Sequence, residues 1–347
     1  MLPEAAELLV LAAAGLAFAF VFTPAAIPRR ALAFQGGAGV VAGAAIALVP
    51  TLDLTLLILV ALGTVDAAMG GRRTFAVRMR APVFAAGILA LALILGRVEG
   101  PEVLGRFASV GLVAGLAAAI GLLPYMHAFQ ADEATPASPL VWMVFVGPLL
   151  AAVLVARAQS LISVDAGVAL AAMLIGLGLL NMAWGAIAAW LTPSDEAAWR
   201  YSFIADWGLV LCGFGLTLVD GRRAALLALF SIVVCRLPLY LVSREPAGRR
   251  PRTEGPINVL AAAALAGSAP FVGFAARVLL LRGATQLFWP LALALAVAML
   301  LWLPGSLRLG RGLGAPRGRQ ALGVALVLAV NVAAGLYPLP LLAVAGL

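Results

Sequence analysis

Long apolar segments recur along the whole sequence and constrain its fold more than any other feature. Stretches of about 17–25 residues carry almost no charge, and each is long enough to cross a hydrocarbon layer of about 30 Å as a helix. Of the 347 residues, 64% are hydrophobic and 11% are charged. The chain therefore cannot cover a soluble domain with a polar surface. The sequence predicts an all-α polytopic transmembrane helix bundle, because a β-barrel would show short alternating strands.

The predicted bundle has about twelve spans joined by short loops. No loop is long enough to hold a soluble domain, so any redox or nucleotide chemistry is expected in partner chains. The spans are 5–27, 31–49, 54–71, 82–96, 107–126, 139–156, 164–191, 201–219, 224–242, 256–280, 284–304 and 320–345.

The distribution of basic residues predicts the orientation. The sequence has no lysine, and its 23 basic residues are all arginines. Fifteen lie in the loops that follow odd-numbered spans, six lie in the other loops, and two lie within spans. The positive-inside rule then places the first set in the cytoplasm and both termini outside. We attribute the net charge of +8 to this asymmetry rather than to nucleic-acid binding. An arginine-only chain rich in alanine and glycine is typical of GC-rich bacteria, which predicts a multi-pass protein of the bacterial inner membrane.

Two predicted spans are interrupted. Pro124 follows the apolar run of the fifth span, and Gly267, Pro270 and Gly273 lie in the middle of the tenth. A break at membrane depth frees backbone groups that only protein or a water-filled cavity can satisfy. A pair of such breaks indicates an ion or substrate path, whereas each break alone could be a simple kink.

Few ionisable residues fall within the predicted spans, and these are candidate functional residues because charge is costly in a bilayer. They are Asp66, Asp206, Arg236 and Arg277, with His127 at the end of the fifth span. An arginine keeps its proton at any accessible pH, so it can hold a carboxylate or set a field but cannot carry a proton in turn. The acid at position 66 could also lie near the cytoplasmic end and pair with a loop arginine. The two cysteines are not grouped with each other or with histidine, so no metal site is expected.

Four stretches together resemble one family. Residues 115–157, with "GLLPYMHAFQADEATPASPL", are similar to a hairpin of glycine-rich helix, Pro-aromatic-His, acidic loop and Ala-Pro-Thr-Pro. Residues 195–216 resemble a Lys-Arg pair followed by Ala-Tyr-Ser-Ser-Ile, 229–241 resemble a Lys-Ala-x-Leu-Phe helix, and 265–283 resemble Leu-Ala-Gly-x-Pro-Pro-x-x-Gly-Phe-x-x-Lys. These are the motifs of antiporter-like membrane subunits of respiratory complex I, Mrp-type cation/proton antiporters and membrane-bound hydrogenases. The quinone-proximal subunit type is the nearest match. The resemblance implies an antiporter-like core at 107–283, between helices 1–106 and 284–347.

The sequence departs from this family along the line of charged residues that carries protons there. The family glutamate falls near Gly63, with Asp66 one helical turn further on. Two lysine positions fall at Ala119 and near Val146, and two later ones fall at Arg236 and Arg277. The loop histidine falls at Met126, next to His127. The resemblance therefore implies a degenerate proton path, with its first half deleted and its second half fixed as arginine.

Three functions remain open at this stage. The first is a subunit of a multi-subunit respiratory or ion-translocating complex, held by other membrane subunits within the lipid bilayer. Its role would be proton translocation through a reduced path or mainly structural coupling, and quinone, flavin and Fe–S would be bound only by partner subunits. The second is a stand-alone cation/proton or small-solute transporter. The third is an intramembrane enzyme using His127 with Asp132 and Glu133, although a loop histidine near two acids is usually a surface hydrogen-bonding group. We expect a non-catalytic subunit with no cofactor of its own.

Overall fold

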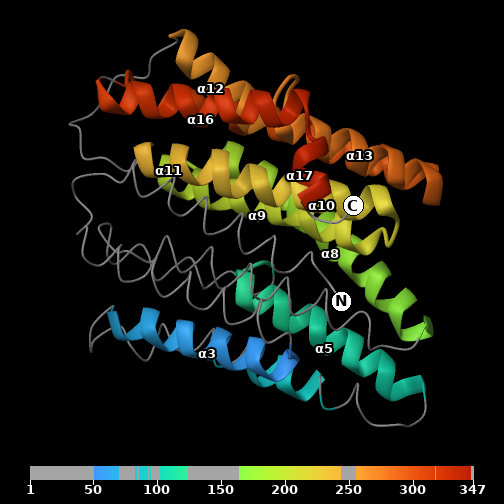
Figure 1. Ribbon diagram of the computed structural model, residues 1–347. Coiled ribbons are helices and arrows are strands. Elements are labelled where there is room, and N and C mark those ends of the chain that lie inside the picture. Colours follow the sequence, from blue (N-terminus) through green and yellow to red (C-terminus); the bar gives the residue numbers. More distant parts are fainter. Residues whose placement is uncertain are drawn as a thin grey trace. The chain divides into compact units, whose positions relative to one another are not determined.

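The computed structural model describes residues 51–69, 83, 86–92, 94, 102–123, 164–243, 255–316 and 318–344. All regular structure within these ranges is helical, which confirms the predicted all-α class for this part of the chain (Figure 1). The chain forms two compact units, which we describe separately. The first comprises Met1–Ala13 and Ile27–Leu174, and the second comprises Ala14–Ala26 and Ile175–Leu347.

Helices α3 (Leu52–Met69) and α5 (Glu102–Ile120) belong to the first unit. Glycines on α5 allow close packing against the helical residues 86–92. A Cβ atom at Gly111 would lie 2.9 Å from the Cβ of Ala92, and one at Gly115 would lie 2.6 Å from Cγ of Leu89. Small residues let membrane helices approach in this way, because packing rather than the hydrophobic effect joins helices in a bilayer.

The second unit contains most of the described helices. Helix α8 (Val164–Leu191) starts in the first unit and enters the second at Ile175. The elements that follow are α9 (Asp195–Gly215), α10 (Val219–Ser231), the π-helix η1 (Ile232–Arg236), α11 (Leu237–Ser243), α12 (Pro256–Ala266), α13 (Val272–Leu287), α14 (Trp289–Leu300), α15 (Trp302–Gly312), α16 (Arg319–Leu336) and α17 (Leu339–Val344).

Three helices of the described part are long and apolar enough to cross a membrane: Gly167–Leu191, Val219–Ser243 and Trp289–Gly312. They differ in how much protein surrounds them. The second, formed by α10, η1 and α11 in succession, is 94% buried over its most apolar window, whereas the other two are 39% and 33% buried. The helix from Val219 to Ser243 is therefore the central helix of the second unit.

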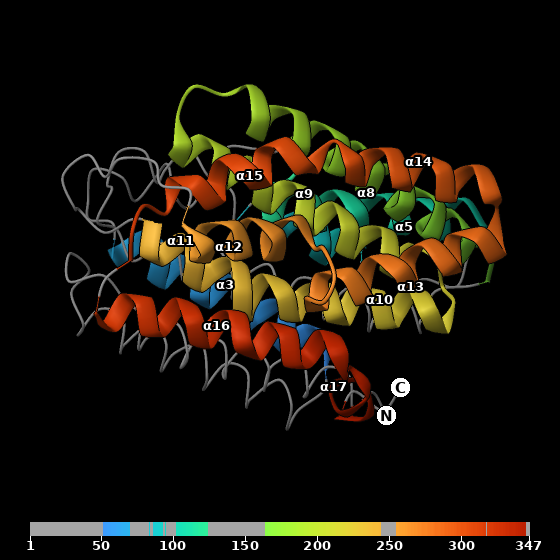
Figure 2. The ribbon, with the colours of Figure 1, turned by 90° about the horizontal axis from the view of Figure 1, so that it is seen from above.

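The other helices of this unit pack around the central one. Helix α10 packs against α9 and α13, and α16 packs against η1 and α11. Figure 2 shows α12 and α13 following one another with a break between them, beside α14 and α15 on one side and α16 on the other.

Helix α12 packs closely against α15, and α16 packs closely against the break that follows α12. At Gly310 of α15, a Cβ would lie 2.6 Å from that of Ala262, and Asn258 of α12 donates hydrogen bonds to the carbonyls of Gly310 (3.0 Å) and Gly314 (2.7 Å). On α16, a Cβ at Gly335 would overlap the backbone of Pro270 within the break. Gly335 therefore lets α16 pack closely against the break, in which Ala269 and Pro270 remain exposed.

Candidate functional site

The break between α12 and α13 begins with a glycine in the left-handed conformation. Gly267 has φ 62° and ψ 42°, and its N–H donates to the carbonyl of Ala264 (3.0 Å). The N–H of Ser268 donates to the carbonyl of Ala263 (3.0 Å). This pair of bonds is the Schellman motif, which satisfies two of the four carbonyls left open at a helix C-terminus. The last two carbonyls, of Leu265 and Ala266, need other donors.

Two arginines supply those donors. Nη2 of Arg236 donates to the carbonyl of Leu265 at 2.9 Å, and Nη1 of Arg277 donates to the carbonyl of Ala266. A cation at a helix C-terminus is favoured by the helix dipole as well as by the hydrogen bond. The carbonyls that the break frees at the end of α12 are thus satisfied by side chains.

Glycine is favoured where Arg277 crosses the break. A Cβ at position 267 would overlap Nη1 of Arg277, and the positive φ there disfavours other residues. Gly273, in the first turn of α13, is also constrained, because its Cβ would lie 3.0 Å from Cα of Gly267. The glycines therefore let the arginine reach the end of α12.

A π-helical turn places Arg236. Arg236 is the last residue of η1, and Pro238 follows two positions later. A proline inside a helix has no N–H for the carbonyl four residues earlier, and its ring crowds that carbonyl. That carbonyl belongs to Val234, and it accepts a hydrogen bond from Nδ2 of Asn331 on α16 (3.4 Å). The proline therefore favours a disturbed turn here, and Asn331 of α16 bonds to the carbonyl that the proline leaves without its usual partner.

Arg236 also forms an ion pair with Asp206 of α9 through its Nε atom. Trp302, the first residue of α15, lies against both arginines. The guanidinium carbon of Arg277 is 4.9 Å from the centre of its indole ring, and that of Arg236 is 5.4 Å away. We call Asp206, Arg236, Arg277 and Trp302 the charge cluster. The arginines are 4% and 8% exposed, so the cluster lies inside the unit.

Aromatic side chains pack beside the cluster, where the guanidinium carbon of Arg236 lies 6.0 Å from the centre of the Phe203 ring. Trp199 and Phe203 precede Asp206 on α9, and Tyr240 follows Arg236 on α11. The ring centre of Tyr240 is 5.7 Å from that of Trp199 and 5.7 Å from that of Phe203. The contact with Phe203 is edge-on. All three are buried, so this side of the cluster is packed with rings rather than open to water.

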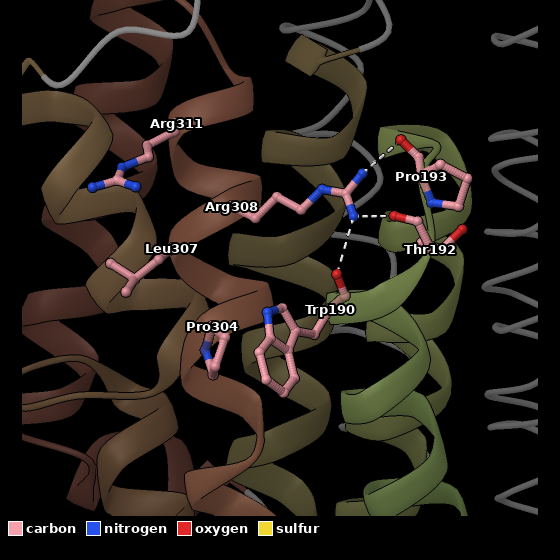
Figure 3. Close-up of a pocket in the computed structure, with 7 residues that line it drawn as sticks. All are labelled: Trp190, Thr192, Pro193, Pro304, Leu307, Arg308 and Arg311. Atoms are coloured by element: carbon pink, nitrogen blue, oxygen red, sulfur yellow. Dashed lines mark hydrogen bonds between the residues drawn. The ribbon is translucent and has the colours of Figure 1, made fainter.

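A separate pocket of about 530 Å³ lies at the end of α8 and does not include the charge cluster. Arg308 dominates it. Its guanidinium donates to the carbonyls of Trp190, Thr192 and Pro193 and to Oδ1 of Asp195 at 2.8 and 2.9 Å. Figure 3 shows this side chain spanning from α15 to the end of α8, while Arg311 lies beyond Leu307. Protein acceptors take up the donors of Arg308, so its role is to tie α15 to the α8–α9 turn.

The structure brings three of the five predicted charged residues together, namely Asp206, Arg236 and Arg277. Asp66 lies in α3 of the other unit. His127 and the predicted break at Pro124 lie outside the described residues. In the tenth predicted span, Gly267 and Pro270 lie in the break itself, and Gly273 lies just after it.

Sequence reasoning missed Trp302 as a member of the cluster and Asn331 as a partner of the π-helical turn. One signal was present: Pro238, two residues after Arg236, predicts a disturbed turn beside the arginine. The carbonyls of Leu265 and Ala266 carry no sequence signal of their own, because every residue has a carbonyl.

Comparisons with known proteins show which solved structures share this architecture. No protein-family model matches the sequence, and no curated protein matches it. Among solved structures, a chain of the Mrp complex from Dietzia sp. DQ12-45-1b is similar with a TM-score of 0.76 and 16% identity over 99% of this chain. The match spans 44% of that Mrp chain, which is more than twice as long.

Two further solved structures are similar over most of both chains. A chain of respiratory complex I from Thermus thermophilus with bound NADH has a TM-score of 0.72 and 16% identity, covering 96% of this chain and 81% of that one. A chain of the membrane-bound sulfane sulfur reductase, an archaeal respiratory membrane complex, has a TM-score of 0.72 and 19% identity, covering 99% and 81%. This chain shares the fold of these three membrane-complex chains. At these identities the likeness establishes the fold. The chain is therefore a membrane protein, and the solved chains that share its fold are parts of membrane complexes.

Proposed function

We propose that this chain is an antiporter-like integral membrane subunit of a multi-subunit respiratory or ion-translocating complex, in which the charge cluster holds the broken helix and does not relay protons. The observation that carries the first part is the likeness in fold to chains of three such complexes over 96–99% of this sequence. The finer statements of about twelve spans, termini outside, a bacterial inner membrane and redox cofactors bound only by partner subunits belong to the same proposal.

The chemistry of the cluster supports the second part. A relay residue must bind and release a proton in turn, and arginine does not release its proton. Both arginines also have a structural task, because they satisfy the last two carbonyls of α12. Asp206 is the only member that can titrate, and it is paired with Arg236. These contacts favour a structural and coupling role.

Purification tests the membership of a complex. A tagged full-length chain extracted from its native membranes in mild detergent is expected to retain partner subunits in fixed stoichiometry. A stable, monodisperse chain without partners would instead support the stand-alone transporter.

Proton stoichiometry tests the role of the cluster. In the reconstituted parent complex, Asp206→Asn is expected to leave the number of protons moved per turnover unchanged, because no proton passes through the cluster. Asp220→Asn is the matched control, since Asp220 pairs with the exposed Arg282 (3.1 Å) and lies outside the cluster. A fall in stoichiometry with Asp206→Asn alone would place Asp206 in a proton path and contradict the structural role.

A further inference from the structure

The charge cluster carries more positive than negative charge. Arg236 and Arg277 contribute two positive charges, and Asp206 contributes one negative charge. The carbonyls of Leu265 and Ala266 lie at the C-terminus of α12, where the helix dipole is equivalent to about half a negative charge. A positive excess therefore remains among the described residues, at a depth where uncompensated charge is costly.

Three nitrogen donors of the cluster also have no hydrogen-bond partner within the described part of the chain. They are Nη1 of Arg236, Nε of Arg277 and Nε1 of Trp302. All three side chains are more than nine-tenths buried, and both guanidinium groups lie within 5.4 Å of the centre of the same indole ring. Oδ2 of Asp206, the ion-pair partner of Arg236, is also buried without a hydrogen bond and can accept from Arg236. Buried donors in native proteins have acceptors, so the donors of Arg277 and Trp302 still need one near the indole.

From the excess charge and these donors, we infer that the cluster binds a small monovalent anion, such as a halide, beside the indole of Trp302. A single anion supplies both the missing negative charge and the missing acceptor. Water would satisfy the donors but would leave the charge uncompensated. A monovalent anion leaves the cluster about half a charge from neutrality, whereas a divalent anion would leave about one and a half negative charges and would need more donors than the cluster offers. This site is independent of the proposed function, because it concerns what the arginines bind and not whether the chain belongs to a complex.

Thermal unfolding of the full-length protein in detergent tests the site, with sodium bromide as the probe and sodium gluconate at equal ionic strength as the reference. Ligand binding to the folded state raises the melting temperature in a saturable way, whereas general salt effects do not saturate at a specific site. We expect a saturable rise in bromide and none in gluconate. Identical melting curves in the two salts would overturn the inference.

Two variants locate the effect. Arg277→Gln removes the positive excess and is expected to abolish the bromide dependence. Trp302→Phe keeps an aromatic ring beside both guanidinium groups but removes the N–H, so the bromide midpoint should rise by about tenfold or more, as for a lost hydrogen bond to a charged group.

Trp207→Phe is the matched control, because Trp207 is equally buried (2% exposed) but lies outside the charge cluster. It is expected to lower the melting temperature without moving the bromide midpoint. If Arg277→Gln does not fold, the bromide midpoints of the two tryptophan variants still show whether the anion binds beside Trp302. A bromide midpoint that is the same in Trp302→Phe as in the unaltered protein would overturn the inference.

Discussion

Arg236 shows what an arginine can do at a buried membrane position that a lysine cannot. Its planar guanidinium pairs with Asp206 through Nε and reaches the carbonyl of Leu265 through Nη2. A lysine has one ammonium group at the end of a flexible chain and no fork of donors in a fixed plane. Arg236 stands where the family that the sequence resembles has a proton-carrying lysine. Its guanidinium is thus suited to joining two helices.

We therefore expect Arg236→Lys to destabilise the protein by about 1–3 kcal/mol, because one of the two buried acceptors loses its donor. The measurement is the thermal or denaturant unfolding of the detergent-solubilised chain. Arg282→Lys is the control, since that side chain is 66% exposed and pairs with Asp220 near a helix end. Its effect is expected to stay within about 0.5 kcal/mol. Equal effects of the two changes would contradict the fork argument.

Gly267 gives a second prediction at this scale. Gly267→Ala should cost about 1–2 kcal/mol for the left-handed backbone alone, and more because the new methyl group displaces Arg277 from the carbonyl of Ala266. Gly176→Ala in α8 is the matched control, because a Cβ there meets nothing within 4 Å. That change should be neutral or stabilising by up to about 1 kcal/mol, since alanine favours a helix. A stable Gly267→Ala protein would show that the crossing of Arg277 over the break is not required.

At the scale of elements, the break after α12 was predictable and the π-helix was not. Glycine and proline at 267 and 270 have local effects on the backbone, so their sequence positions alone indicate where a helix ends. The π-helical turn depends on how Val234, Pro238 and α16 fit together in three dimensions, which periodicity does not encode. The sequence marked Asp206, Arg236 and Arg277 as charged residues within spans, but it did not predict that they meet, because nothing local relates α9, η1 and α13.

Asn331 tests the coupling between η1 and α16. Asn331→Leu keeps a similar volume but removes the donor to the carbonyl of Val234, which the missing N–H of Pro238 leaves without its usual helix partner. We expect a loss of about 1–3 kcal/mol in unfolding free energy. Thr285→Ala is the control, because its exposed hydroxyl bonds only back to the carbonyl of Leu281 in its own helix (2.8 Å). If both changes are harmless, the bond between η1 and α16 contributes nothing measurable.

At the scale of the whole molecule, the basic residues of the second unit fall at opposite helix ends. Arg308 ties the end of α15 to the start of α9, and Arg311 follows on α15. Arg282 lies near the end of α13 and pairs with Asp220 at the start of α10. The positive-inside rule predicts the first end in the cytoplasm and the second outside.

Cysteine labelling on intact cells checks this orientation. The native thiols, Cys212 and Cys235, are buried, so they give little background. A membrane-impermeant maleimide is expected to label Arg282→Cys in intact cells and to label Arg311→Cys only after the cells are opened. The reverse pattern would invert the predicted topology and require a different number of spans before the second unit.

The two arginine bonds at the end of α12 have a mechanical consequence. A helix interrupted by glycine and proline would ordinarily bend at the interruption and absorb a displacement there. Here Arg277, which belongs to α13, is bonded to the carbonyl of Ala266 at the end of α12, and the adjacent carbonyl is bonded to η1. A push on α13 would therefore be passed to α12 and to the central helix together, as the movement of a rigid body.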